Sequence, residues 1–75
     1  MKYLNFSVII EEDKDGFFAF CPELQGCYTQ GDSYEIAMDN VKDAIQLHVK
    51  DRIAGRKEKL ERLKSISLST VEVAV

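Results

Sequence analysis

The 75-residue sequence is poor in the features that build membrane spans, leader peptides and disulfide frameworks. No apolar run approaches the roughly eighteen residues that a membrane-spanning helix needs. The first ten residues, MKYLNFSVII, place no small-residue cleavage site behind a long apolar core, so a cytoplasmic protein is expected. The two cysteines, Cys21 and Cys27, are too few for a disulfide framework and are expected to be reduced, partly buried thiols.

The sequence also lacks the groups of residues that catalysis and metal binding require. The single histidine, His48, lies on the apolar stripe of a predicted helix and is interpreted as a packed residue, without zinc-ligand partners at suitable spacing. Glu11, Glu12, Asp13 and Asp15 gather in one predicted turn, where carboxylates spread into water instead of converging on a metal. No glycine-rich phosphate loop is present. We therefore predict no enzyme activity, cofactor or metal; the less favoured alternative is a residual metal-dependent nuclease using Glu11, Glu12 or Asp15.

Basic side chains are scarce outside one segment. Residues 50–64 carry seven basic and three acidic side chains, a charge of +4, whereas the other sixty residues carry three basic and ten acidic side chains, a charge of −7. An acidic body does not attract nucleic acid, whose binding depends on neutralising phosphates, but it attracts a basic protein. The basic segment lacks interleaved aromatic residues, so we interpret it as a solvated helix face and expect no direct nucleic-acid binding.

Apolar periodicity and turn residues predict three short strands, at residues 3–10, 17–21 and 27–30. The Asp15-Gly16 pair favours a hairpin turn between the first two strands. Pro22 ends the second strand, because proline cannot donate to a ladder, and Gly26 closes the loop that follows. Connections this short favour an antiparallel meander.

A helix is predicted to follow, from Tyr34 to about residue 54, because apolar residues recur there at steps of three and four. Asp32 and Ser33 are both suitable N-caps, and the sequence leaves the choice open. Gly31 is expected to adopt a positive φ before the helix. A short basic helical segment is predicted at 55–64, and the alternating, β-branched residues 66–75 predict a closing strand.

These elements predict one α+β domain, 1–75, with the order βββα(α)β. The fourth strand is expected to lie parallel to the first, because a helical crossover connects it, and the helix is expected to pack on one face of the sheet. A chain this short builds only a small core, so a homodimer or larger homo-oligomer is expected.

The loops between residues 22 and 32 are the candidate partner-binding site, since loops at strand ends on a rigid sheet often carry binding function. Tyrosine is enriched at protein interfaces, and one beside acidic groups suits a basic partner. A Tyr28 that simply packs in the sheet is an equal alternative. The candidate partner-binding residues are Glu23, Gln25, Tyr28, Gln30 and Asp32.

The stretch FSVIIEEDKDGFFAFCPELQGCYTQGDSYEIAMDNVKDAIQLHV resembles the HicB family of antitoxins, including its short, stand-alone members. The similarity covers about residues 3–50 and is carried by CPELQGC followed by TQGD. It implies a degraded, partial ribonuclease H-like fold that has lost the nuclease carboxylates. It also implies a partner, the small basic HicA toxin, which cleaves messenger RNA and which the antitoxin neutralises by capping its active surface.

Many members of that family carry a further DNA-binding domain, whereas this sequence finishes in the predicted strand at 66–75, so operator repression by this chain alone is not expected. The leading hypothesis is an antitoxin that binds a HicA-like toxin. The alternative is an orphan HicB-like module whose activity is self-association or the binding of another partner.

Overall fold

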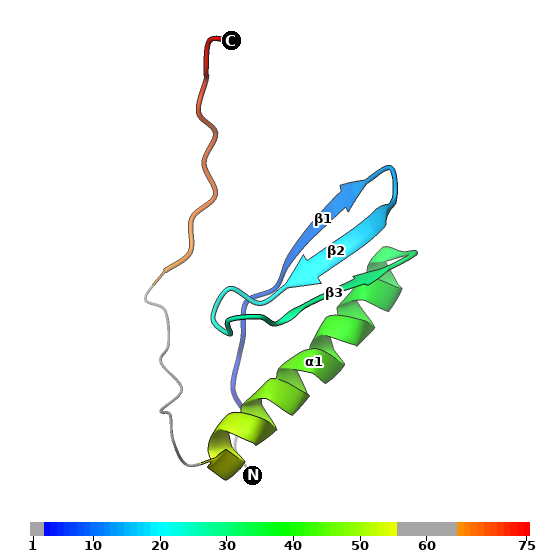
Figure 1. Ribbon diagram of the computed structural model, residues 1–75, viewed down its shortest axis with the longest axis vertical. Coiled ribbons are helices and arrows are strands. Elements are labelled where there is room, and N and C mark those ends of the chain that lie inside the picture. The colour runs from blue at the N-terminus through cyan, green and yellow to red at the C-terminus, as the bar shows by residue number, and fades with distance from the viewer. Residues whose placement is uncertain (1–2, 56–64) are drawn as a thin grey trace.

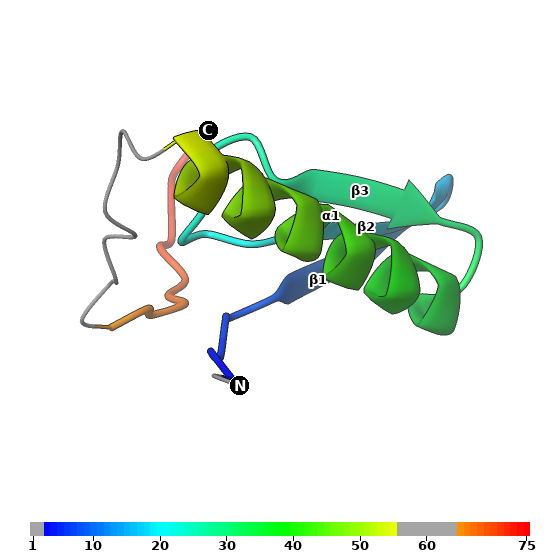
Figure 2. The same ribbon diagram turned by 90° about the horizontal axis from the view of Figure 1, so that it is seen from below.

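The computed structural model of the chain describes residues 3–55 and 65–75. Three strands, β1 (Ile9–Asp13), β2 (Gly16–Phe20) and β3 (Tyr28–Gly31), form one antiparallel sheet in the order β1-β2-β3. The helix α1 (Tyr34–Gly55) follows and lies across one face of this sheet (Figures 1 and 2). The predicted α+β class, three-stranded meander and helix on one face are therefore confirmed. Among the described residues, no helix has the length and apolar character needed to cross a membrane.

The β1–β2 hairpin turns one residue earlier than the Asp-Gly pair suggested. Asp13 is paired with Gly16, so Lys14 and Asp15 are the two loop residues. The N–H of Asp15 donates a hydrogen bond to Oδ1 of Asp13 at 2.8 Å, and Gly16 has a φ of 139°. The predicted hairpin turn is thus confirmed, although Gly16 begins β2 instead of occupying the turn.

The first strand is displaced along the chain from the predicted range 3–10 and continues to Asp13, through acids assigned above to a turn. The cause lies in β2. Ile9 is paired with Phe20, and the same register continued would place Ser7 opposite Pro22. Proline has no N–H to donate, so the ladder stops before that position. The N–H of Ser7 donates instead to the Oε1 atom of Glu23.

The core lies between α1 and the sheet face toward it, and small side chains let the two layers approach closely. Ala19, Ala37 and Val41 are fully buried in one cluster. Beside it, Cys21, Leu24 and Cys27 form a second buried cluster, against which Ala44, Ile45 and Val49 of α1 pack. Both cysteines are buried, more deeply than the partly buried thiols that were predicted.

The start of α1 settles which residue is the N-cap. The N–H of Ile36 donates to Ser33 Oγ at 3.1 Å, and the N–H of Ala37 donates to the Ser33 carbonyl oxygen at 3.0 Å. Ser33 is therefore the N-cap, and its side chain satisfies a donor that the first helical turn would leave unpaired.

Gly31 does not have the positive φ expected before the helix; among the described glycines, only Gly16 and Gly26 do. Its lack of a side chain matters for another reason. A Cβ at Gly31 would lie 2.7 Å from the backbone nitrogen of Ala37 and 2.7 Å from Cγ2 of Ile36. The expectation of positive φ was wrong, and close approach of the β3 end to α1 is what favours glycine here.

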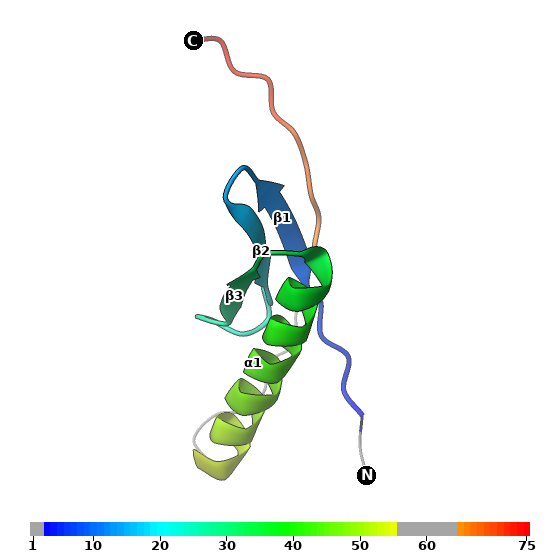
Figure 3. The same ribbon diagram turned by 90° about the vertical axis from the view of Figure 1, so that its right-hand side faces the viewer.

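The predicted closing strand at 66–75 is not present. Residues 65–75 form no strand, and their side chains are exposed (Figures 1 and 3). Alternation favours an extended chain, but a strand also needs a neighbouring edge, and the described sheet has three strands. The prediction of a fourth strand, parallel to the first, is therefore corrected: the described residues form a three-stranded sheet. The basic helical segment predicted at 55–64 lies outside the described residues, apart from Gly55, which ends α1.

Candidate protein-binding surface

The helix α1 covers one face of the sheet, and no element within the described residues covers the other, here called the outer face. Successive strand residues point to opposite sides, and Ala19 points toward α1, so its neighbours on β2 point outward. The strand register then places two rows of side chains on the outer face. These rows are Ile9, Phe20 and Tyr28, and beside them Glu11, Phe18 and Gln30.

Aromatic side chains dominate the middle of the outer face. Phe18 and Phe20 are half-buried, whereas Tyr28 is 75% exposed. Phe20 and Tyr28 lie directly opposite each other on adjacent antiparallel strands, a position that brings two aromatic side chains close together. The 75% exposure of Tyr28 leaves most of its side chain available for contact with a partner.

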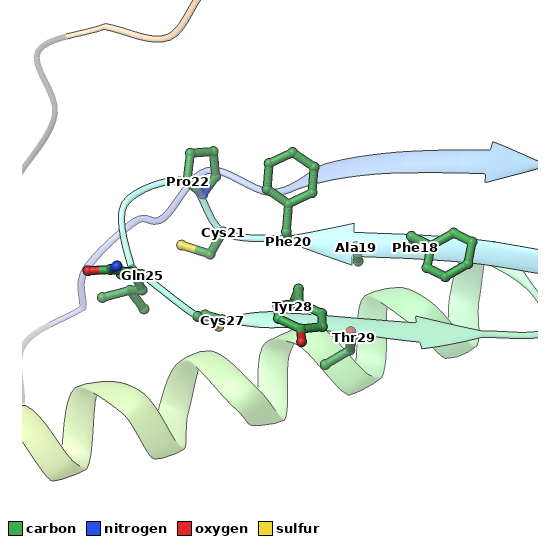
Figure 4. A pocket seen from close by; sticks show the side chains of 11 residues that line it. Phe18, Ala19, Phe20, Cys21, Pro22, Gln25, Cys27, Tyr28 and Thr29 are labelled. Carbon is green, nitrogen blue, oxygen red and sulfur yellow. The ribbon is translucent and has the colours of Figure 1, made fainter.

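An open hollow of about 460 Å³ lies where the outer face meets the loop after β2 (Figure 4). The side chains of Phe18, Phe20, Pro22, Gln25 and Tyr28 are among those that line it. The lining is mainly apolar, so the hollow suits an apolar or aromatic side chain of a partner.

Three backbone hydrogen bonds shape the loop that borders this hollow. Cys21 N–H donates to the Cys27 carbonyl at 3.0 Å, while Leu24 N–H donates to Cys21 and Cys27 N–H donates to Leu24, both at 3.1 Å. Gly26 adopts a φ of 80°, which closes the loop as predicted. Because Leu24 is buried, the loop is anchored in the core and presents Gln25 at its exposed tip.

A second, smaller hollow of about 230 Å³ lies at the other end of β3. Its lining includes Asp15, Phe18, Gln30, Asp32 and Ile36. The carbonyl oxygen of Gln30 accepts a hydrogen bond from Asn40 Nδ2 at 2.9 Å, which ties this part of β3 to α1. Phe18 borders both hollows, while Ile36 of α1 also lines the smaller one.

The structure places four of the five candidate residues at these two hollows. Gln25 and Tyr28 line the larger hollow, and Gln30 and Asp32 line the smaller one. Glu23 is half-buried and accepts the Ser7 N–H, so it holds the loop to the segment before β1.

Phe18 and Phe20 were not among the candidates, although the sequence contained the signal for them. A single helix covers only one face of a sheet, so the alternation in the stretch Phe17–Phe20 had to leave at least one phenylalanine uncovered, and the structure leaves Phe18 and Phe20. The outer face is therefore more aromatic than the candidate residues alone suggested.

Carboxylates surround this aromatic centre. Residues 3–33 contain six acidic side chains and one lysine, and all of the acids except Glu23 are exposed. Glu11 and Glu12 are successive strand residues and so point to opposite faces of the sheet. Among the residues that the structure describes, no three potential metal ligands come together. The acids therefore give the surface a diffuse negative charge instead of converging.

An uncovered sheet face with aromatic side chains at its centre and acids around it has the character of a candidate protein-binding surface. The chain belongs to the HicB-like antitoxin family of bacterial toxin–antitoxin systems, whose family model matches residues 6–72. It is similar to a UPF0150 protein of Helicobacter pylori, with 41% identity over 68 residues that cover 91% of this chain and 93% of the relative.

Other relatives come from distant organisms. A UPF0150 protein of the archaeon Archaeoglobus fulgidus is 35% identical over 71 residues, covering 93% of this chain and 96% of that protein. A UPF0150 protein of Synechocystis is 45% identical over 51 residues, covering 67% of this chain and 65% of that protein. No solved structure gives a significant match.

Proposed function

We propose that this protein neutralises a small basic HicA-like toxin by binding it through the outer face of the sheet. Membership of an antitoxin family supports a protein-binding role and favours a function without catalysis. The observation that carries the proposal is the exposed Tyr28, which stands beside Phe18 and Phe20 on a face that no other element of residues 3–55 and 65–75 covers.

The two kinds of side chain on this surface contribute differently to binding. Aromatic side chains that become buried at the centre of an interface supply most of the affinity. The surrounding carboxylates, including Asp15 and Asp32, attract a basic partner and orient its approach, which raises the association rate. A toxin bound here would have its basic, RNA-contacting surface covered, so capping the active surface is the mechanism we propose.

We further propose that the antitoxin acts in the cytoplasm, where its toxin would meet messenger RNA, and as a homodimer or larger homo-oligomer. The fully buried hydrophobic residues in the described part of the chain are few: Ala19, Cys21, Leu24, Cys27, Ala37 and Val41. A core of this size supplies little stability, and association with a second copy adds to it.

The test of the aromatic centre uses a HicA-like toxin, sought first among the proteins encoded by the neighbouring genes. Replacing Tyr28 by alanine should weaken binding roughly 30-fold, the effect of losing about 2 kcal/mol at an interface centre. Leu47→Ala is the matched control, because Leu47 is 61% exposed on α1, away from the outer face. Titration calorimetry measures both affinities. Equal affinities for the two variants would show that the toxin binds elsewhere.

The test of the acidic border measures association rates at low and high salt. Asp32→Lys should slow association at low salt, and the difference should shrink at high salt because surface charges are screened there. Asp43→Lys, an equal charge reversal at an exposed position of α1, should have a much smaller effect. If the neighbouring protein is harmless when expressed alone, the antitoxin function fails for this chain.

A further inference from the structure

The two hollows at the ends of β3 differ in the chemistry of their linings. The larger hollow, of about 460 Å³, is lined mainly by apolar residues, and none of its lining residues carries a charge. The smaller hollow, of about 230 Å³, is lined by two exposed acids, Asp15 and Asp32, and by Gln30. Two neighbouring hollows of different character suit two different side chains of one partner.

The lining of the smaller hollow suits a cation. Gly16, one of its lining residues, has a φ of 139°, a conformation that disfavours any side chain, so backbone forms this part of the surface. The carboxylates of Asp15 and Asp32 are hydrogen-bond acceptors, and Phe18 adds an aromatic ring. Carboxylates and ring faces both attract cations. Lysine and arginine side chains carry only donors, so they match these acceptors.

The charge of the surrounding chain favours a basic partner for the same reason. Residues 3–33 carry six acidic and one basic side chain, a net charge of −5. The one basic side chain, Lys14, lines neither hollow, and no other lysine or arginine of the described residues lines them. Within the described part of the chain, the smaller hollow is therefore left for a cation from another molecule.

The spacing of the hollows limits what a partner can present. Phe18 lines both hollows, while Phe20 lines only the larger and Gly16 only the smaller. Phe20 and Gly16 are four residues apart on β2, which corresponds to about 13 Å along a strand. Side chains at positions i and i+4 of an extended strand have this separation, and side chains two turns apart on a helix, at about 11 Å, come close to it.

We propose that this surface recognises a two-residue pattern in its partner. An apolar side chain is seated in the larger hollow, and a lysine or arginine, about 11–13 Å away on the same element, is seated in the smaller hollow beside Phe18. The inference rests on the proposed toxin-binding function and specifies what the toxin must present. The apolar contact supplies affinity. The cation sets the register, because a shifted partner would leave its charge against the apolar lining.

The first experiment probes both hollows without any toxin. Nuclear magnetic resonance spectra of the nitrogen-15-labelled full chain follow titration with N-acetyltryptophanamide and with N-acetylargininamide. The tryptophan probe should shift the amides of Gln25 and Tyr28, and the arginine probe those of Gly16 and Asp32. Any other distribution of shifts would overturn the proposal. Shifts of these amides with the concentration of the chain alone would assign the surface to a second copy and would also overturn it.

Variants of the same chain test whether the two hollows act separately. Asp32→Asn should weaken binding of the arginine probe about threefold or more, the effect of losing an exposed ion pair, and leave the tryptophan probe unchanged. Tyr28→Ala should do the reverse. Asp43→Asn removes an equal charge from α1 and should change neither. Equal weakening of the arginine probe by Asp32→Asn and Asp43→Asn would show a general attraction by charge and refute the pattern.

The second experiment uses the toxin and separates this inference from the proposed function. Each lysine and arginine of the toxin is replaced by glutamate in turn, and affinities for the native chain and for Asp32→Lys are measured. Asp32→Lys should restore binding to one of these toxin variants, whereas Asp43→Lys should restore none. Tight toxin binding without such a rescue would refute the two-residue pattern and leave the antitoxin function standing. A toxin that does not bind the native chain would refute the proposed function and, with it, this inference.

Discussion

Gly31 joins β3 to the start of α1, and we expect Gly31→Ala to destabilise the protein through overlap with the helix. The added Cβ would lie 2.7 Å from the Ala37 backbone nitrogen, 2.7 Å from Ile36 Cγ2 and 3.1 Å from the Ile36 carbonyl carbon. Two of these three atoms belong to the helix backbone and move only if α1 shifts. Overpacking of this kind costs about 1–3 kcal/mol.

A smaller effect acts in the opposite direction. Gly31 does not have a positive φ, so alanine fits its backbone conformation and reduces the entropy of the unfolded chain, which stabilises by about 0.4–1 kcal/mol. The overlap is the larger of the two, and the net loss should be about 1–2 kcal/mol. For a domain of this size, that loss lowers Tm by about 4–16 °C.

Urea and thermal denaturation followed by circular dichroism measure this loss. The control is a double-mutant cycle with Ile36→Ala, which removes Cγ2 at a side chain that is 48% exposed. If overlap is the cause, Gly31→Ala should cost less in the Ile36→Ala background, while the overlap with the Ala37 nitrogen keeps the cost above zero. A Gly31→Ala variant as stable as the native protein would refute the reasoning.

Two further predictions concern hydrogen bonds that the structure assigns. Ser33→Ala should lower the free energy of unfolding, measured with urea, by about 1 kcal/mol, because it removes the N-cap of α1. Asp32→Ala should change the same free energy by no more than about 0.5 kcal/mol. Equal losses in the two variants would contradict the assignment of Ser33 as the cap. Glu23→Ala should speed hydrogen exchange of the Ser7 amide, because the amide loses its hydrogen-bond acceptor. Glu23→Gln keeps a side-chain oxygen and should preserve most of the protection. Unchanged exchange in Glu23→Ala would exclude this hydrogen bond in solution.

Short-range sequence patterns predicted the structure correctly where a residue's conformation and burial depend on its neighbours along the chain. The spacing of Ala37, Val41 and Ile45 correctly predicted the buried stripe of α1. Pro22 and Gly26 correctly marked the loop after β2, since one lacks a donor and the other tolerates a positive φ. These properties belong to single residues or to one helical turn.

The predictions that failed depended on what lies across the sheet. Residues 3–8 alternate as a strand should, but only the β1–β2 register reveals that Pro22 would face Ser7 and end the ladder. Residues 66–75 alternate equally well, and no edge pairs with them in the single chain. For the candidate site, Tyr28 was identified and its exposure left open, while Phe18 and Phe20 were missed.

The sequence by itself determined the class of fold, the order of its first four elements and the acidic character of its surface, because periodicity, turn residues and charge can be read along the chain. Tertiary structure alone decided which sheet face stays uncovered, which residue caps α1, why Gly31 carries no side chain and which strand edge stays open. Each of these depends on contacts between segments far apart in sequence, and pairwise distances between segments are not encoded in any local pattern.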